Sequence, residues 1–122
     1  MLSAGLVVLT SLLGPSQEMT ASWYGPGFHG NVTASGDTFD MHAMTCASPD
    51  LPFGSVLLIE HGQYKVAVTV TDRGPFAVDS TGAAIWPLEP HPHRDLDLSF
   101  GAMKLLGGVL DGTIDAEVWR LR

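Results

Sequence analysis

The feature that most constrains the fold is the alternating run YKVAVTVT at residues 64–71. Every second residue in it, from Tyr64 to Val70, is valine or tyrosine, and this period of two is typical of a half-buried β-strand. The apolar run SVLLIE at 55–60 precedes it, and only three residues separate the two. The two segments are therefore predicted to form a β-hairpin, and the chain to be mainly β.

The remaining periodic segments predict more short strands and little helix. Strands are expected at 18–25 and 113–121, and residues 39–47 fit either a short helix or an extended stretch. Ser99 suits a helix N-cap, and the apolar spacing after it predicts one short helix that ends at a pair of glycines. About five or six strands with one or two short helices favour a small closed β-barrel over a sandwich, because closure removes exposed strand edges.

The segments without periodicity are expected to be two loops and an N-terminal segment outside a single domain. Glycine-rich residues 25–38 and proline-rich residues 77–94 are expected to be loops, and the second is long enough to suggest a functional role. The apolar run LVVLTSLL resembles the core of an export signal, but no Lys or Arg precedes it and no A-x-A pattern follows it. Residues 1–18 are thus expected to be an apolar arm or an atypical signal segment, and residues 19–122 to form one domain.

Composition excludes several function classes. The net charge is -7 with only six Lys and Arg, so a basic face for nucleic acid or for an anionic membrane surface is not expected. The apolar run is far shorter than the roughly 20 residues that span a bilayer. A neutral polymer such as a glycan remains a suitable partner.

Metal and cofactor chemistry finds little support in the sequence. The single cysteine, Cys46, excludes an internal disulfide and a Cys-based zinc cluster, and a buried thiol is expected there. His91 and His93 in the HPH motif lack a third ligand at metal-site spacing, so we interpret them as part of a solvated loop. No cofactor and no metal are predicted.

Four segments in order carry a family resemblance. They are ASWYGPGFHGNVTASGDTFDMHAMT at 21–45, LPFGS at 51–55, VTDRGPF at 70–76 and DLDLSFGAMKLLG at 95–107. Together they resemble the double-psi β-barrel domain of the rare lipoprotein A family of bacterial cell-wall proteins. The resemblance implies a six-stranded double-psi β-barrel with lytic transglycosylase activity on peptidoglycan glycan strands. The barrel is also similar to the first domain of expansins, which loosen or bind wall polysaccharides.

The resemblance also implies site residues. The catalytic acid pair of the family falls on Asp72, in DRGPF, and on Asp37, where the family usually has Glu. A third acid, from the DLS motif that expansins share, falls on Asp97. Ser48 stands where the family commonly has His a few residues before LPFG. Residues 79–94 look inserted relative to the family.

Local sequence context supports some of these catalytic and binding roles, and it also allows purely structural roles for the same residues. Asp72 ends a strand beside a turn, so it is the first candidate for a general acid/base, although it could also form a surface ion pair or a turn. Asp37 suits turn chemistry and Asp97 suits the start of a helix. Arg73 is expected to brace the loop through backbone carbonyls.

Tyr24 and Trp86 are candidates for stacking on sugar rings. Trp23 and Tyr24 are neighbours in a predicted strand, so they face opposite ways, and we expect Trp23 in the core and Tyr24 in the groove. Trp86 lies in the long loop and is the second stacking candidate. The predicted substrate-binding set is Tyr24, Asp97, Ser48 and Trp86.

Three functions remain open at this level. The first is a peptidoglycan lytic transglycosylase of the bacterial envelope or periplasm, with Asp72 as acid/base assisted by Asp37. The second is a glycan-binding, expansin-like barrel without turnover. The third is a wall-penetrating part of a larger assembly, such as a phage tail tip, in which residues 1–18 and 77–94 contact protein partners.

Overall fold

The computed structural model describes residues 14–122. Most of the segment expected to be an arm or signal, residues 1–18, lies outside the described residues. The first strand begins at Gln17, so the last two residues of that segment belong to the barrel.

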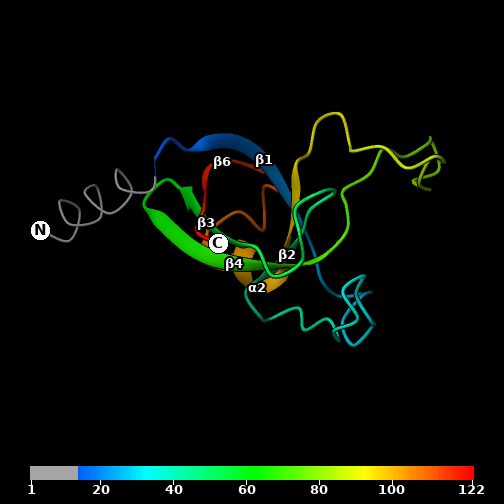
Figure 1. Cartoon of the computed structure of the whole chain (residues 1–122), viewed down its shortest axis with the longest axis horizontal. Helices are drawn as coiled ribbons and strands as arrows, with labels where there is room; N and C mark the ends of the chain where they lie inside the picture. The colour runs from blue at the N-terminus through cyan, green and yellow to red at the C-terminus, as the bar shows by residue number, and fades with distance from the viewer. Residues whose placement is uncertain (1–13) are drawn as a thin grey trace, which may run out of the picture.

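Six strands close into a barrel within the described residues, and one helix packs against it (Figure 1). The order around the barrel is β1-β5-β2-β4-β3-β6. This confirms the predicted six-stranded double-psi β-barrel. The elements are β1 (Gln17–Tyr24), β2 (Thr45–Ala47), β3 (Val56–His61), β4 (Tyr64–Asp72), β5 (Leu96–Ser99), α2 (Phe100–Leu105) and β6 (Ile114–Arg120).

The strand pairings explain how distant motifs meet. β3 and β4 form the predicted antiparallel hairpin, while β1 pairs in parallel with β5, and β2 in parallel with β4. The two parallel pairs bring the ends of β1, β2, β4 and β5 together across long stretches of sequence. The ambiguous residues 39–47 form turns followed by the short strand β2.

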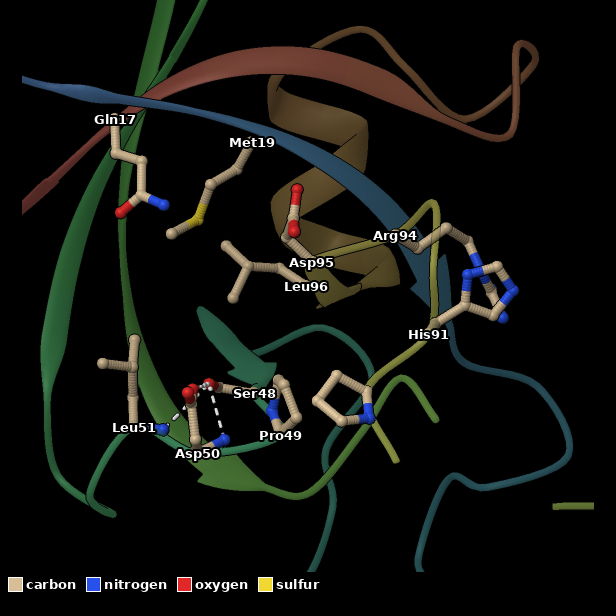
Figure 2. A pocket seen from close by; sticks show the side chains of 11 residues that line it. Gln17, Met19, Ser48, Pro49, Asp50, Leu51, His91, Arg94, Asp95 and Leu96 are labelled. Carbon is tan, nitrogen blue, oxygen red and sulfur yellow. Dashed lines mark hydrogen bonds between the residues drawn. The ribbon is translucent and has the colours of Figure 1, made fainter. Parts of the chain in front are cut away.

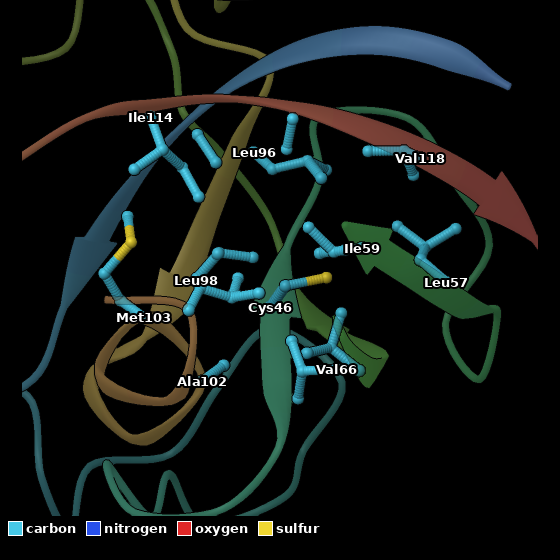
Figure 3. Close-up of a cluster of buried hydrophobic side chains, with 14 of the residues drawn as sticks. Cys46, Leu57, Ile59, Val66, Leu96, Leu98, Ala102, Met103, Ile114 and Val118 are labelled. Atoms are coloured by element: carbon cyan, nitrogen blue, oxygen red, sulfur yellow. The ribbon is translucent and has the colours of Figure 1, made fainter. Parts of the chain in front are cut away.

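The barrel interior is filled by alternate residues of the strands, shown in Figure 3. Val66, Val68 and Val70 of β4 point into this core, as their period of two predicts. Tyr64 begins the same strand but stays 47% exposed, because it lies at the hairpin end of the barrel. The largest fully buried side chains include Leu57, Ile59, Leu96, Leu98, Met103 and Leu106.

The predicted helix start is confirmed. The Ser99 hydroxyl accepts a hydrogen bond from the amide of Ala102 at 3.2 Å, as an N-cap does, and donates one to the carbonyl of Ala43 at 2.6 Å. The same residue closes β5, so the chain passes from strand to helix without a loop.

Cys46 is fully buried in β2, and this gives a pH-dependent prediction. Burial, and then the nearby charge of Asp97, raises the pKa of the thiol from 9.0 to about 12. Between these values the unfolded chain loses a proton that the folded chain keeps, so folding stability must fall as pH rises. The slope from this group approaches about 1.4 kcal/mol per pH unit.

Urea unfolding at a series of pH values from 8 to 12 checks this expectation. Above pH 9, the unfolding free energy of the unmutated protein should decline more steeply than that of Cys46→Ala. The variant should be less stable at every pH, because it lacks a buried side chain. Equal slopes in the two proteins would contradict the prediction.

Residues 77–94 form the predicted long loop, and their order is local. The Asp79 carboxylate accepts hydrogen bonds from the amide and hydroxyl of Thr81 and the amide of Ala83. Bridges between Val78 and Ala84 and between Phe76 and Pro90 tie the loop to itself and to its base. In Figure 1 this loop (yellow-green) and the loop after β1 (cyan) extend from the same side of the barrel. Residues 14–122 contain no helix with the length and apolar character needed to cross a membrane.

Candidate active site

Four neighbouring strands bring one row of residues together on the outer face of the barrel. The register pairs Ser22 with Asp97, Asp97 with Ala47, and Ala47 with Asp72. Directly paired residues point to the same face of a sheet, so these four side chains share a face. We call them the acidic row. The small residue Ala47 separates the two carboxylates by two strand spacings, about 10 Å between backbones.

A β-bulge is the reason that Asp72 joins this row. Val70 points into the core and pairs with Cys46, so simple alternation would send Asp72 inward as well. The register shifts between Cys46 and Ala47, and Thr71 is the extra residue on β4. The bulge thus turns Asp72 outward, and bulges of this kind often re-aim a side chain beside an active site.

The Asp72 carboxylate is held by three donors. Its Oδ1 accepts hydrogen bonds from the amides of Ala34 at 3.0 Å and Arg73 at 2.9 Å, and its Oδ2 accepts one from the Tyr24 hydroxyl at 3.1 Å. The carboxylate is partly exposed, so it is both oriented and accessible. A turn residue in a surface ion pair would not need three converging donors, and the Asp72–Arg73 contact runs through the backbone amide.

Tyr24 points toward Asp72, on the face of the acidic row. Its ring stacks on Phe39 at 4.4 Å, and its hydroxyl points to Asp72, whereas Trp23 packs against the core. Burial, followed by the charge of Asp72, raises the pKa of the Tyr24 hydroxyl well above its usual range. The hydroxyl therefore stays protonated as a hydrogen-bond donor to Asp72.

Asp97 lies in the acidic row, shortly before the start of α2. Its Oδ1 accepts a hydrogen bond from the Ser22 hydroxyl and lies 3.7 Å from the guanidinium of Arg94. Asp97 lies in β5, two residues before the Ser99 N-cap, and the first turn of α2 itself contains no acidic residue. A Cβ at Gly74 would lie 3.8 Å from Asp97 Oδ2, which places the DRGPF turn directly beside this acid.

Asp37 lies on a loop that is bonded to Asp72, but its own carboxylate bonds within the loop. It is exposed on the loop that contains Ala34, and its carboxylate accepts a hydrogen bond from the Ser35 hydroxyl at 3.3 Å. The loop is docked on the end of β4 by Ala34 and by the bond from the Ser35 amide to the Thr71 carbonyl. Asp37 thus lies on a segment anchored at Asp72, with its side chain in solvent.

Ser48 and Arg73 shape the turn beneath the row. Arg73 donates hydrogen bonds to the carbonyls of Ser48 at 3.3 Å and Leu51 at 2.8 Å, which confirms its predicted bracing role. The guanidinium also lies 3.8 Å from the centre of the Phe53 ring. The Ser48 hydroxyl is buried and accepts a hydrogen bond from the Leu51 amide at 3.1 Å, so it is already engaged in the turn.

A pocket of about 270 Å³ adjoins the row, between the Ser48 turn and the end of the long loop (Figure 2). Arg94 and His91 form one wall, and Figure 2 shows their side chains next to each other. Its remaining lining includes Gln17 and Met19 of β1 and Asp50 beside Ser48. The pocket lining contains none of the four row residues, and the link between the two is Arg94, which lines the pocket and donates a hydrogen bond to Ser22.

Trp86 and the two loop histidines lie outside the row. Trp86 is 77% exposed in the long loop. The amide of His93 donates a hydrogen bond to His91 Nδ1, so this pair supports the loop turn. Across residues 14–122, no group of three or more His, Cys, Asp or Glu side chains has a geometry that could hold a metal ion.

Sequence reasoning missed two residues of the site. Ser22 was present in the ASWYG motif, but only the pairing with β5 reveals its contact with Asp97. Arg94, three residues before Asp97, is the last residue of the predicted loop 77–94. Its position relative to Asp97 was a usable signal, since residues three apart at a loop-to-strand junction can meet.

Comparison with known proteins identifies related sequences. Residues 16–118 match the sequence profile of the family described as lytic transglycolase. An endolytic peptidoglycan transglycosylase RlpA from Pseudomonas aeruginosa is 42% identical over 102 residues, and the match covers 81% of this chain and 26% of that protein. A similar protein from Campylobacter jejuni is 35% identical, with 83% of this chain and 32% of the relative covered.

A third relative and one solved structure are also similar to this chain. A probable endolytic peptidoglycan transglycosylase RlpA from Aquifex aeolicus is 41% identical, and the match covers 84% of this chain and 40% of the relative. This chain therefore spans well under half the length of these relatives. Among solved structures, the Streptomyces papain inhibitor matches with a TM-score of 0.60 and 18% identity, covering 88% of this chain and 94% of that one. At that identity the likeness shows the fold alone.

Proposed function

Because this chain belongs to the lytic transglycolase family of double-psi β-barrels, we propose that it cleaves peptidoglycan glycan strands by lytic transglycosylation. The single observation that carries this proposal is the acidic row, in which a bulge turns Asp72 out of the core toward Tyr24 and toward the face of Asp97. The relatives named above act on peptidoglycan according to their names, and the matched region contains the whole row.

Asp72 is the proposed acid/base. In this reaction one carboxyl group protonates the glycosidic oxygen, then takes a proton from the 6-hydroxyl of the muramoyl residue as that hydroxyl attacks the anomeric carbon. The product is a 1,6-anhydro sugar, and no water is consumed. The Tyr24 hydroxyl and the two backbone amides hold Asp72 in one orientation, and proton transfer in both steps requires such an orientation.

A second carboxylate can stabilise the positive charge that develops on the sugar ring. We propose Asp97 for this role, because it shares the face of Asp72 and is held by Ser22 and Arg94. Asp37 stays the predicted assistant to Asp72. Its exposed position on the Ala34 loop suits contact with a bound strand at the rim of the site.

The proposed substrate sets the place of action. Peptidoglycan lies in the bacterial cell envelope, so we propose that the protein works there on glycan strands. Protein partners through residues 77–94 and a role in a larger particle stay predictions. That loop exposes Val78, Ile85, Trp86 and Leu88, a set of side chains that suits contact with either a polymer or a protein.

Incubation with purified glycan strands, with and without stem peptides, tests the proposal. Mass spectrometry should detect fragments with 1,6-anhydro ends that accumulate with time. A binding module without turnover would instead sediment with the strands and release nothing, and this result would favour the expansin-like alternative.

Trp86→Ala separates substrate contact from folding. Because Trp86 is 77% exposed, its removal should change the unfolding free energy by less than about 0.5 kcal/mol. If the ring stacks on the strand, the variant should bind glycan strands more weakly in a sedimentation assay. Unchanged sedimentation would remove Trp86 from the substrate-binding set.

A further inference from the structure

We infer that Arg94 is a positioning residue that fixes the Asp97 carboxylate through the hydroxyl of Ser22. The inference rests on the proposed function, in which Asp97 stabilises the charge on the sugar ring. Arg94 Nη1 donates a hydrogen bond to Ser22 Oγ at 2.9 Å, and the Ser22 hydroxyl donates one to Asp97 Oδ1. The direct distance between Arg94 Nη1 and Asp97 Oδ1 is 3.7 Å.

Chemistry fixes the direction of this relay. A guanidinium only donates hydrogen bonds and an ionised carboxylate only accepts them, whereas a hydroxyl has one proton and two lone pairs. Ser22 must therefore accept from Arg94 and give its single proton to Asp97. Ser22 is only 5% exposed, so water has little access to compete for that proton. The relay leaves Asp97 with its Oδ1 engaged and its position set from one side.

The second arginine near the row is occupied elsewhere. Arg73 donates to the carbonyls of Ser48 and Leu51 and covers the ring of Phe53, so its guanidinium supports the turn. The Arg94 side chain is 33% exposed at the wall of the pocket, and its contact with Asp97 closes the long loop onto β5. Arg94 thus supplies the cation for the acidic row.

The two acids of the row consequently have different partners. Asp72 accepts hydrogen bonds from two amides and a neutral hydroxyl, whereas Asp97 accepts from a hydroxyl that is itself bonded to a cation. Enzymes that use two carboxylates assign them different tasks through such differences in surroundings. Arg94 is the group that creates this difference.

Kinetics of Arg94→Ala test the relay. We expect kcat to fall by about 10- to 100-fold, the usual effect of misplacing a catalytic group, with KM nearly unchanged. Arg94→Lys should recover part of the loss, and guanidinium chloride at low concentration should rescue Arg94→Ala. Urea has the same shape without the charge and should not rescue it. Lys104→Ala, which removes a positive charge from the exposed side of α2, is the matched control and should retain full activity.

A second readout does not depend on activity. In NMR spectra, three-bond couplings of the Asp97 side chain should report one rotamer in the unmutated protein and averaging in both Arg94→Ala and Ser22→Ala. Averaging in neither variant, equal rescue by urea, or a loss confined to KM would overturn the inference. If the unmutated protein releases no product, the proposed function fails, and the couplings still decide whether Arg94 positions Asp97.

Discussion

Asp72→Asn should reduce the release of anhydro-ended fragments by about 100- to 10,000-fold, the range typical of removing a general acid/base. Asparagine has nearly the same size, and its carbonyl oxygen still accepts from the amides of Ala34 and Arg73. Its amide group replaces Oδ2 beside the Tyr24 hydroxyl, which can accept a hydrogen bond there. The fold should therefore persist while proton transfer is lost.

Product release is measured by chromatography and mass spectrometry under identical conditions for three proteins. Asp111→Asn, an exposed acid in the turn before β6, is the matched control and should behave as the unmutated chain. Binding of glycan strands by Asp72→Asn should persist in a sedimentation assay. Substantial turnover by Asp72→Asn would remove Asp72 from the acid/base role.

Gly101→Ala should destabilise the fold, although alanine in a helix is normally more favourable than glycine by roughly 1 kcal/mol. Gly101 is in the first turn of α2, and a Cβ there would lie 2.5 Å from the carbonyl oxygen of His42 and 2.8 Å from its carbonyl carbon. These are backbone atoms that cannot rotate away. The Gly101 amide also donates to the Met41 carbonyl at 2.8 Å, so the loop is held against the helix.

The expected loss is about 1–3 kcal/mol of unfolding free energy, the usual cost of inserting a methyl group into a packed site. Urea denaturation measures it, with Gly27→Ala as control because nothing lies within 4 Å of a Cβ at that position. A more stable Gly101→Ala protein would show that the loop yields and that helix propensity decides the outcome.

Local patterns were sufficient for several elements of the fold. The hairpin follows from the valine alternation of β4, and the helix start follows from Ser99, because both signals lie within a few residues of sequence. The strand β5 was not predicted from the sequence pattern. Its four residues are too few to show a period and run directly into the helix, and their strand character comes from pairing with β1 and β2.

The site was predictable only in part, for a similar reason. The DRGPF motif and Tyr24 were both predicted to belong to the site. The structure brings them together, although they are far apart in the sequence. The bulge at Thr71 and the relay from Arg94 depend on strand register between segments far apart in the chain. No single segment of the sequence indicates the bulge or the relay, so neither could be predicted without knowing which strands pair.

If the acidic row cleaves a glycosidic bond by internal attack of a sugar hydroxyl, water contributes no atom to the new ends. The most direct test is digestion of peptide-free glycan strands in water labelled with heavy oxygen, followed by mass spectrometry of the new ends. We expect anhydro-ended fragments that carry no label, because no water enters the product. Labelled reducing ends would show hydrolysis and contradict the proposed reaction, and intact strands would leave the barrel as a binding module.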